Sequence, residues 1–175
     1  DGKFSQTLYQ QFLAQSGLTD QMIRKDIAAM FRGVPHLLRR PQKPGEEGRL
    51  LGMVLIASFP VIVAGFLLNL WEPEWLRSPL TIAITTIVFG ILLWWADQKP
   101  DDKELPALNG KQALFIGISQ ILALIPGTSR SGITMTAARY LGYSRVEAAR
   151  FSLLLAIIAI SGAGTLIGLE LWVSQ

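Results

Sequence analysis

The residues best suited to chemistry in this sequence lie in the stretch 126–132, which reads Pro-Gly-Thr-Ser-Arg-Ser-Gly. Arg130 stands between Ser129 and Ser131, shortly after an apolar run over 113–125. A guanidinium can hold a phosphate through two hydrogen bonds, and neighbouring hydroxyls can add more. An arginine at membrane depth costs roughly 2.5–3.5 kcal/mol on insertion scales, so it needs such a partner. This pattern therefore indicates an anion site.

The backbone of the same stretch supports this interpretation. Pro126 disfavours helix in the residue before it, and Gly127 allows the chain to turn, so the incoming helix should end near Ile125. We expect the next helix to begin between Ser129 and Ser131, with its free N–H groups directed at the same point as the arginine. A helix N-terminus of this kind binds anions.

The elements around this stretch are those of a membrane protein. Hydrophobic residues make up 50% of the chain and are gathered into long runs. The net charge is only +3, which gives no general case for nucleic acid as a partner. The sequence contains no cysteine, which excludes disulfides, thiolate catalysis and cysteine-zinc sites. We predict an all-α integral membrane protein that is embedded in the lipid bilayer.

Three apolar runs are close to the length that crosses ~30 Å of hydrocarbon, and they predict spans at about 50–70, 80–96 and 151–173. The run over 113–125 is too short to cross, and suits a re-entrant helical hairpin over about 113–141. We therefore assign residues 49–175 to a membrane domain with about three transmembrane helices and this hairpin.

Residues 1–48 form a polar N-terminal segment that contains a basic amphipathic helix over Thr19–Arg40. Such a helix either lies on an anionic membrane surface or is the solvated end of a longer helix. The basic residues cluster before the first span, in 97–111 and in 139–150, which the positive-inside rule places in the cytoplasm. Both flanks of the hairpin then lie on one side of the membrane, as a re-entrant segment requires. We interpret Arg139, Arg145 and Arg150 as interfacial charges.

Other polar residues admit more than one role. Gln120, inside the short apolar helix, either hydrogen-bonds to another helix or lines the site. Ser144 and Glu147 have capping-box spacing and predict the start of the last helix. Arg130 also has a purely structural alternative, in which it snorkels or pairs with Glu170 or a lipid headgroup.

The run from Gln120 to Gly132 resembles the second signature motif of the undecaprenyl-diphosphate phosphatases, the bacitracin-resistance membrane proteins of bacteria. The similarity extends through residues 49–65, 90–97 and 147–156. The resemblance implies hydrolysis of undecaprenyl diphosphate to undecaprenyl phosphate, the lipid carrier of cell-wall synthesis. It also implies a multi-pass protein of the bacterial inner membrane, with an inverted-repeat fold and two re-entrant hairpins.

The motif match assigns roles to individual residues. It implies that a polyprenyl diphosphate lipid is bound at the turn. The implied catalytic residues are Arg130, Ser129 and Ser131, and the implied substrate-binding residues are Gly127, Thr128, Gly132 and Gln120. The resemblance also implies a divalent cation, magnesium or calcium, although no ligands for it are visible in this sequence. A homodimer is compatible with the sequence.

The family's first motif, which supplies glutamates, a serine and a histidine, has no counterpart in residues 1–48. The chain begins at Asp1 without a methionine, so we expect an N-terminal truncation. Because the nucleophile or general base would come from the first motif, we predict that the isolated chain is inactive unless another copy or fragment completes the site. The alternative function is an inverted-repeat transporter or flippase of polyprenyl phosphate, which could use the same Arg130.

Overall fold

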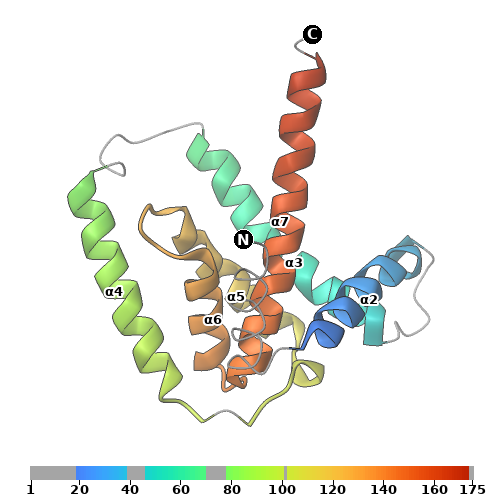
Figure 1. Ribbon diagram of the computed structural model, residues 1–175, viewed down its shortest axis with the longest axis horizontal. Helices are drawn as coiled ribbons and strands as arrows, with labels where there is room; N and C mark the ends of the chain where they lie inside the picture. The colour runs from blue at the N-terminus through green and yellow to red at the C-terminus, as the bar shows by residue number, and fades with distance from the viewer. Residues whose placement is uncertain (1–18, 39–45, 70–77, 101, 174–175) are drawn as a thin grey trace, which may run out of the picture.

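The computed structural model describes residues 19–38, 46–69, 78–100 and 102–173, which form helices joined by short connections (Figure 1). The elements are α2 (Asp20–Leu38), α3 (Glu46–Asn69), α4 (Pro79–Asp97), η2 (Leu105–Ala107), α5 (Gly110–Gln120), η3 (Ile121–Leu124), α6 (Arg130–Tyr140) and α7 (Arg145–Val173). The η elements are single 3₁₀ turns. Apart from an isolated bridge between Lys103 and Tyr143, no β structure occurs in these ranges. The predicted all-α class is confirmed.

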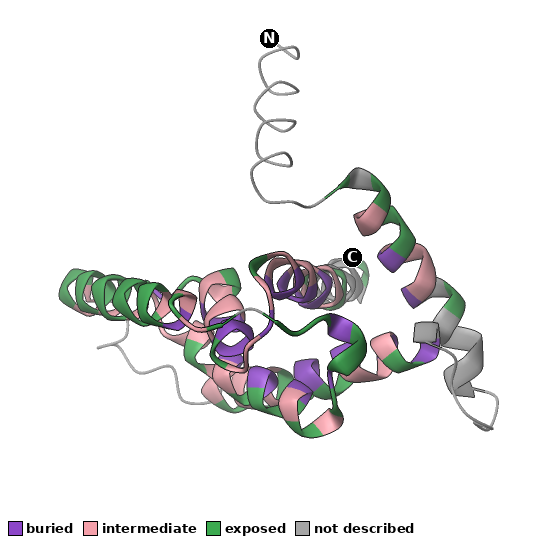
Figure 2. Ribbon diagram, turned by 90° about the horizontal axis from the view of Figure 1, so that it is seen from below, coloured by how far each residue is buried: buried purple, intermediate pink, exposed green. Residues whose placement is uncertain are grey.

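Within the described residues, two helices are long and apolar enough to cross a membrane, over Gly48–Leu68 in α3 and Pro79–Asp97 in α4. Only 22% and 6% of their most apolar windows are buried, so most of their side chains face outward. Figure 2 shows α4 exposed along most of its length. A core helix of a soluble domain would instead bury its apolar face against other elements. The outward faces are therefore suited to lipid, and α3 continues through Pro60.

The core forms where α3 crosses α5. Val54, Ala57 and Ile116 are at most 1% exposed. A Cβ atom added at Gly117 would lie 2.8 Å from the Cα of Ala57, which is too close for any side chain. Small residues of this kind let helix backbones approach closely in membrane proteins. The close crossing holds the first arm of the central hairpin against α3.

Arg139 joins three segments at the end of the bundle where α4 ends, and it is 3% exposed. Its Nε donates to Asp97 Oδ1 (3.2 Å), and its Nη2 donates to the carbonyls of Asp97 and Lys99 (2.8 Å each). Its Nη1 donates to the carbonyl of Tyr143 (2.8 Å). Arg145, which is 68% exposed, binds the same carboxylate through two bonds of 2.8 Å. The interpretation of Arg139 as an interfacial charge is wrong, because its guanidinium is buried and fully engaged by α4 and the adjoining loops.

The amphipathic helix predicted over Thr19–Arg40 is present as α2, which packs along α3. Arg150 of α7 pairs through two nitrogens with Asp26 of α2, whose side chain is 5% exposed. Ser144 caps α7 by accepting from the N–H of Glu147 (3.3 Å). Glu147 does not complete the predicted capping box, because its carboxylate accepts from the N–H of Leu105 (3.2 Å) and from Arg150 (3.2 Å). It thereby joins α7 to the loop before α5.

Candidate functional site

The central element of the site is a helical hairpin made of α5, η3 and α6, which lies between α4 and α7 (Figure 1). A complete capping box between Asn109 and Gln112 starts its first arm. The first arm tightens into a 3₁₀ turn and ends at Leu124, one residue before the predicted end. The second arm begins at Arg130, within the predicted range from Ser129 to Ser131, and Ser129 is its N-cap. It is followed by Gly142 at φ 88°.

The tip of the hairpin is bound by two adjacent threonines in the middle of α4. Thr85 Oγ1 lies 2.7 Å from the carbonyl oxygen of Pro126, and Thr86 Oγ1 lies 3.0 Å from that of Gly127. Each hydroxyl also lies 2.8 Å from a carbonyl oxygen of its own helix, so its single hydrogen is shared between the helix and the tip. Gly127 has a φ of 90°, and a Cβ there would overlap the Thr85 hydroxyl and lie 2.5 Å from the carbonyl oxygen of Ile82. Glycine is therefore required at 127 both by the turn and by the close approach of α4.

The first turn of α6 gathers hydrogen-bond donors. Ser129 Oγ accepts from the N–H of Gly132 (3.2 Å) and lies 3.3 Å from Ser131 Oγ. Both hydroxyls belong to exposed residues, so each can still donate its hydrogen to a ligand oxygen. The first N–H groups of a helix have no intrahelical partner and carry the positive end of its dipole. Helix α6 thus begins within the predicted range, and anion binding at its first turn stays a prediction.

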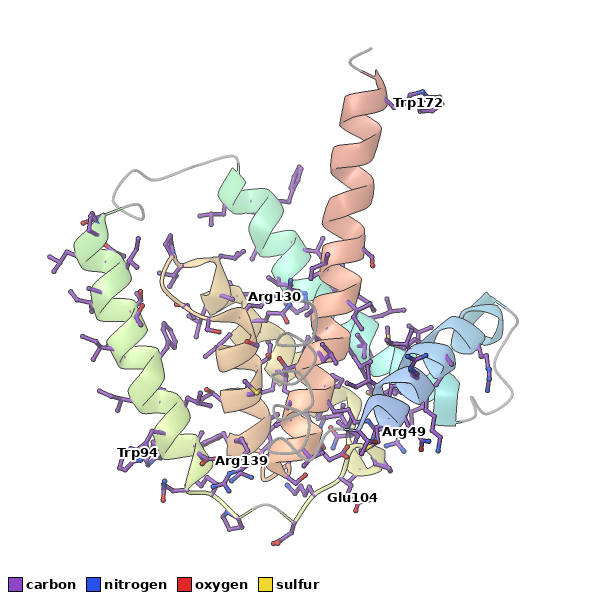
Figure 3. All side chains as sticks on the ribbon, in the orientation of Figure 1. Arg49, Trp94, Glu104, Arg130, Arg139 and Trp172 are labelled. Atoms are coloured by element: carbon purple, nitrogen blue, oxygen red, sulfur yellow. The ribbon has the colours of Figure 1, made fainter. Side chains whose placement is uncertain are left out.

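Helix α7 supports the first turn of α6 from the other side. Thr134 Oγ1 and Ser152 Oγ lie 2.7 Å apart, and both side chains are buried. Arg130 Nη2 donates to the carbonyl of Leu155 over 3.4 Å, which is a long bond. In Figure 3, Arg130 lies at mid-height, with Trp94 and Arg139 at one end of the molecule and Trp172 at the other. The guanidinium is therefore placed deep between the helix ends.

Four buried side-chain atoms in the described part of the chain have no hydrogen-bond partner, and all four belong to this hairpin. They are Nε2 and Oε1 of Gln120, Oγ1 of Thr128 and Nε of Arg130. Gln120 is 0% exposed and Thr128 is 8% exposed. An unpaired buried polar group costs about 1–3 kcal/mol, so several of them within one hairpin call for a polar ligand. Gln120 makes no hydrogen bond to another described helix, and both of its alternative roles stay predictions.

Sequence reasoning missed the residues that hold the tip. Thr85 and Thr86 lie inside a predicted span, and Thr134 and Ser152 lie on the two helices after the tip. Two adjacent hydroxyls in the middle of an apolar run were the available signal for α4. The side chain of Glu170, the alternative partner of Arg130, lies outside the described residues. Trp94, Trp95 and Trp172 are exposed at helix ends, whereas Trp71 and Trp75 are not described.

The fold and the hairpin define a class of protein, an all-helical membrane protein with a polar hairpin set among apolar helices. A family model described as "Bacitracin resistance protein BacA" matches residues 21–174, and the chain belongs to that family. An "Undecaprenyl-diphosphatase" from Hahella chejuensis is 55% identical over 126 residues, covering 72% of this chain and 47% of that protein. One from Chromohalobacter salexigens is 49% identical over 152 residues, covering 83% of this chain and 57% of that protein. The chain thus spans about half the length of the curated relatives it matches.

Proposed function

We propose that this chain is the phosphate-binding part of an undecaprenyl-diphosphatase, a hydrolase that converts undecaprenyl diphosphate to undecaprenyl phosphate for reuse in cell-wall synthesis. One observation carries the proposal. The four unpaired buried polar atoms of the described chain all lie in the hairpin that also holds Arg130 and the α6 N-terminus. The names of the relatives supply the reaction and the lipid.

The same proposal places the chain as a multi-pass protein of the bacterial inner membrane, within a larger inverted-repeat fold. Helices α3, α4 and α7 would cross the bilayer, and the hairpin would enter and leave from one side. The outward apolar faces of α3 and α4 and the mid-height position of Arg130 support this arrangement (Figure 3). Irregular backbone at that depth is tolerated only where protein covers it or where it lines a cavity, and α4 covers the tip at Pro126 and Gly127.

The residues of the tip would bind the diphosphate and offset its charge. Arg130 would donate paired hydrogen bonds to phosphate oxygens, joined by the hydroxyls of Ser129 and Ser131 and the first N–H groups of α6. Gln120 and Thr128 would complete their unmet hydrogen bonds on the same group. Hydrolysis joins a water oxygen to the terminal phosphorus and breaks its bond to the bridging oxygen. Positioning and charge stabilisation are the main demands of that step.

The group that activates the water is not assigned to the described residues. The carboxylates of Asp26, Asp97 and Glu147 are each paired with an arginine. The partner of Asp97, Arg139, lies at the end of the molecule away from the tip (Figure 3). We therefore predict that the isolated chain binds the diphosphate but does not hydrolyse it, unless a second copy or the rest of the protein completes the site.

The divalent cation, magnesium or calcium, stays a prediction from the family resemblance. The tip offers hydroxyl, amide and guanidinium groups. Among the described residues, no group of three or more Asp, Glu, His or Cys side chains could hold a metal ion. Because these residues do not fit a resident cation, no step is assigned to it.

The test is binding of farnesyl diphosphate by the purified chain in detergent, measured by titration calorimetry. Arg130→Gln should weaken binding about 10- to 100-fold, since a hydrogen bond to a charged group is worth about 1.5–3 kcal/mol. Arg145→Gln, the loss of an exposed arginine elsewhere, is the matched control and should leave binding unchanged. Equal affinity of the wild type and Arg130→Gln would exclude the site.

Phosphate release and lipid transfer separate the remaining possibilities. Release by the isolated chain should not exceed that of Arg130→Gln, and robust release would show that the chain is complete in itself. The flippase alternative rests on the same broken hairpin, which transporters also use. If vesicles containing the chain move polyprenyl phosphate between leaflets in an Arg130-dependent way, without release by the full-length protein, the transporter function replaces the hydrolase.

A further inference from the structure

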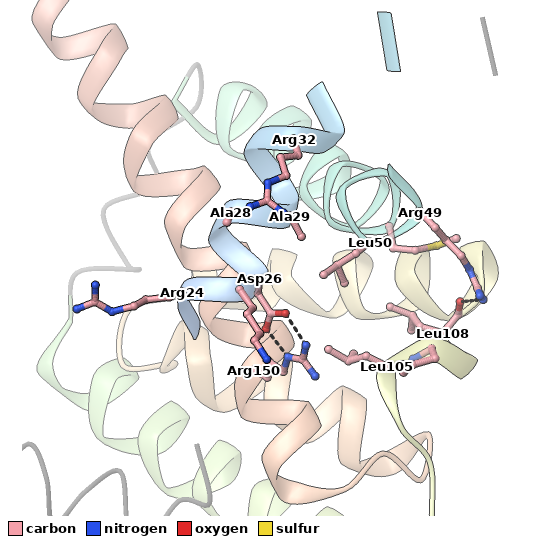
Figure 4. A pocket seen from close by; sticks show the side chains of 13 residues that line it. Arg24, Asp26, Ala28, Ala29, Arg32, Arg49, Leu50, Leu105, Leu108 and Arg150 are labelled. Carbon is pink, nitrogen blue, oxygen red and sulfur yellow. Dashed lines mark hydrogen bonds and ion pairs between the residues drawn. The ribbon is translucent and has the colours of Figure 1, made fainter. Parts of the chain in front are cut away.

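A cavity separate from the hairpin tip opens between α2, the start of α3, η2 and α7 (Figure 4). Its volume is about 590 Å³, and none of its lining residues belongs to α5 or α6. In Figure 3 it lies on the side of the molecule where Arg49 is labelled, away from Trp172. A volume of this size is typical of sites that bind small molecules or headgroups.

The lining is strongly basic. It contains five basic side chains and one acidic one, Asp26, whose carboxylate is already paired with Arg150. Arg24 points away from the cavity in Figure 4, and Arg150 is paired with Asp26 and Glu147, so the other basic side chains of the lining are Lys25, Arg32 and Arg49. Because Asp26 and Glu147 both pair with Arg150, the positive charge that an anionic ligand would offset belongs to the other basic side chains.

The geometry of Arg49 suits a phosphate. Its Nη2 donates to the carbonyl of Leu108 (2.7 Å), which holds the guanidinium at the cavity wall. The other donors of the planar fork stay available for ligand oxygens, because a guanidinium has five N–H groups. Arg150 is held in place by Asp26 and Glu147 at another point of the wall. Two fixed guanidinium groups are thus present around one cavity.

Apolar residues complete the lining and point to the kind of molecule that carries the phosphate. Ala28 and Ala29 of α2 face the cavity together with Leu50, Met53 and Leu105. A soluble phosphate ester would not bury this apolar surface, whereas the glycerol backbone and first methylenes of a phospholipid would cover it. Basic cavities between helices near the cytoplasmic surface recognise anionic lipid headgroups.

We propose that this cavity is a binding site for the headgroup of an anionic phospholipid. The phosphate would bind Arg49, with Lys25 and Arg32 as further cations, and the acyl chains would leave along the apolar side of α2 and α3. This site is independent of the diphosphate site at Arg130, because the two share no residue.

The test uses the purified chain in detergent with equal amounts of dioleoylphosphatidylglycerol and dioleoylphosphatidylcholine, and native mass spectrometry to count retained lipids. The wild type should retain the phosphatidylglycerol preferentially. Lys25→Gln/Arg49→Gln should reduce that preference about tenfold. Lys103→Gln/Lys111→Gln removes two exposed charges outside the cavity and is the matched control, which should keep it.

A second variant tests the cavity without changing charge. Ala29→Trp would fill the cavity and should lower phosphatidylglycerol retention as the charge variant does. It also keeps the test valid if Lys25→Gln/Arg49→Gln fails to fold, which circular dichroism would show. Arg130→Gln should retain the lipid normally, so failure of the diphosphate site would leave this result intact.

Three outcomes would overturn the proposal. Equal losses in the two double variants would show attraction to diffuse surface charge. Full retention by Ala29→Trp would show that the lipid binds elsewhere. Displacement of the lipid by glycerol 3-phosphate at equal concentration would show that the ligand is a soluble phosphate ester.

Discussion

The hydroxyl of Thr85 donates to the carbonyl oxygen of Pro126 over 2.7 Å, and so joins the middle of α4 to the tip of the central hairpin. Thr86 makes the neighbouring bond to Gly127 over 3.0 Å. Helix α4 is the most exposed candidate span, with only 6% of its window buried. A helix that faces outward along most of its length therefore also fixes the backbone of the candidate site.

Replacing Thr85 by valine removes the hydroxyl and keeps the shape. The carbonyl of Pro126 would lose its donor, which costs about 1–3 kcal/mol for a buried group. The melting temperature in detergent should fall by about 2–4 °C per kcal/mol, followed by tryptophan fluorescence, and farnesyl diphosphate should bind less tightly. Ile84→Val, at an exposed position of the same helix, is the control. Unchanged stability and binding in Thr85→Val would contradict the role of this bond.

Two glycines have almost the same φ but different surroundings, so substituting each one distinguishes the cost of backbone strain from the cost of a steric clash. Gly127 (φ 90°) lies against α4, whereas a Cβ at Gly142 (φ 88°) would find no atom closer than 3.7 Å. Gly142→Ala should cost only the strain of the left-handed region, about 1–2 kcal/mol. Gly127→Ala should cost more and should also weaken diphosphate binding, because it displaces the tip from Thr85. Denaturant unfolding of both variants measures the difference, and equal losses would rule out the close approach of α4.

Arg139 and Arg145 share the carboxylate of Asp97 and differ in burial, with 3% and 68% exposure. Arg139→Gln should destabilise the chain by about 3–5 kcal/mol, because it breaks a buried pair and frees three backbone carbonyls. Arg145→Gln should cost at most about 1 kcal/mol, as exposed pairs do. Chemical denaturation provides the comparison, and similar losses in the two variants would mean that burial of Arg139 is not the source of its effect.

The titration of Tyr143 should change the free energy of unfolding at alkaline pH. Burial raises the pKa of its phenol above the ordinary value of 10.0, with the positive charge of Arg49 acting in the opposite direction. Below pH 10 the group is neutral in both states, so its contribution to stability is fully present. Above that pH the unfolded chain ionises first, and the free energy of unfolding falls as pH rises toward the folded-state pKa.

The variant Tyr143→Phe isolates this effect from the titration of other groups. It should have a smaller loss of stability between about pH 9.5 and 11 than the wild type, measured by urea unfolding. It should also lose the bond from the phenol to Gln112 Oε1 (2.8 Å) at every pH. Tyr140→Phe, at an exposed position, is the control. A pH profile of Tyr143→Phe that is parallel to that of the wild type would contradict the prediction.

Local signals were sufficient to predict the helices. Apolar run length defined α3 and α4, and the Pro-Gly turn with its following serine defined the tip and the N-cap of α6. These features depend on neighbours in the sequence, so the predicted boundaries lie close to those of the structure. The sidedness of the membrane depends on loop charges alone and stays a prediction.

Contacts between distant residues were not predictable in the same way. The residues around Arg139 do not distinguish it from other basic residues at a helix end. The burial of its guanidinium depends on where α4 ends, some 40 residues earlier. Glu147 has capping-box spacing, yet the N–H of Leu105 and the guanidinium of Arg150 compete for its carboxylate. Thr85 and Thr86 acquire their role only when the hairpin is packed beside them. In each case tertiary packing selects among partners that local sequence leaves equivalent.

The two threonine bonds at the tip have a final consequence, which concerns the sign of the local electrostatic field. The carbonyl oxygens of Pro126 and Gly127 carry partial negative charge and would repel a phosphate bound near them. The Thr85 and Thr86 hydroxyls of α4 lie within hydrogen-bond distance of both oxygens. The groups left to face a ligand are then the guanidinium of Arg130, the serine hydroxyls and the first N–H groups of α6. Helix α4 thereby separates acceptors from donors at the turn, and leaves a net positive potential where an anion would bind.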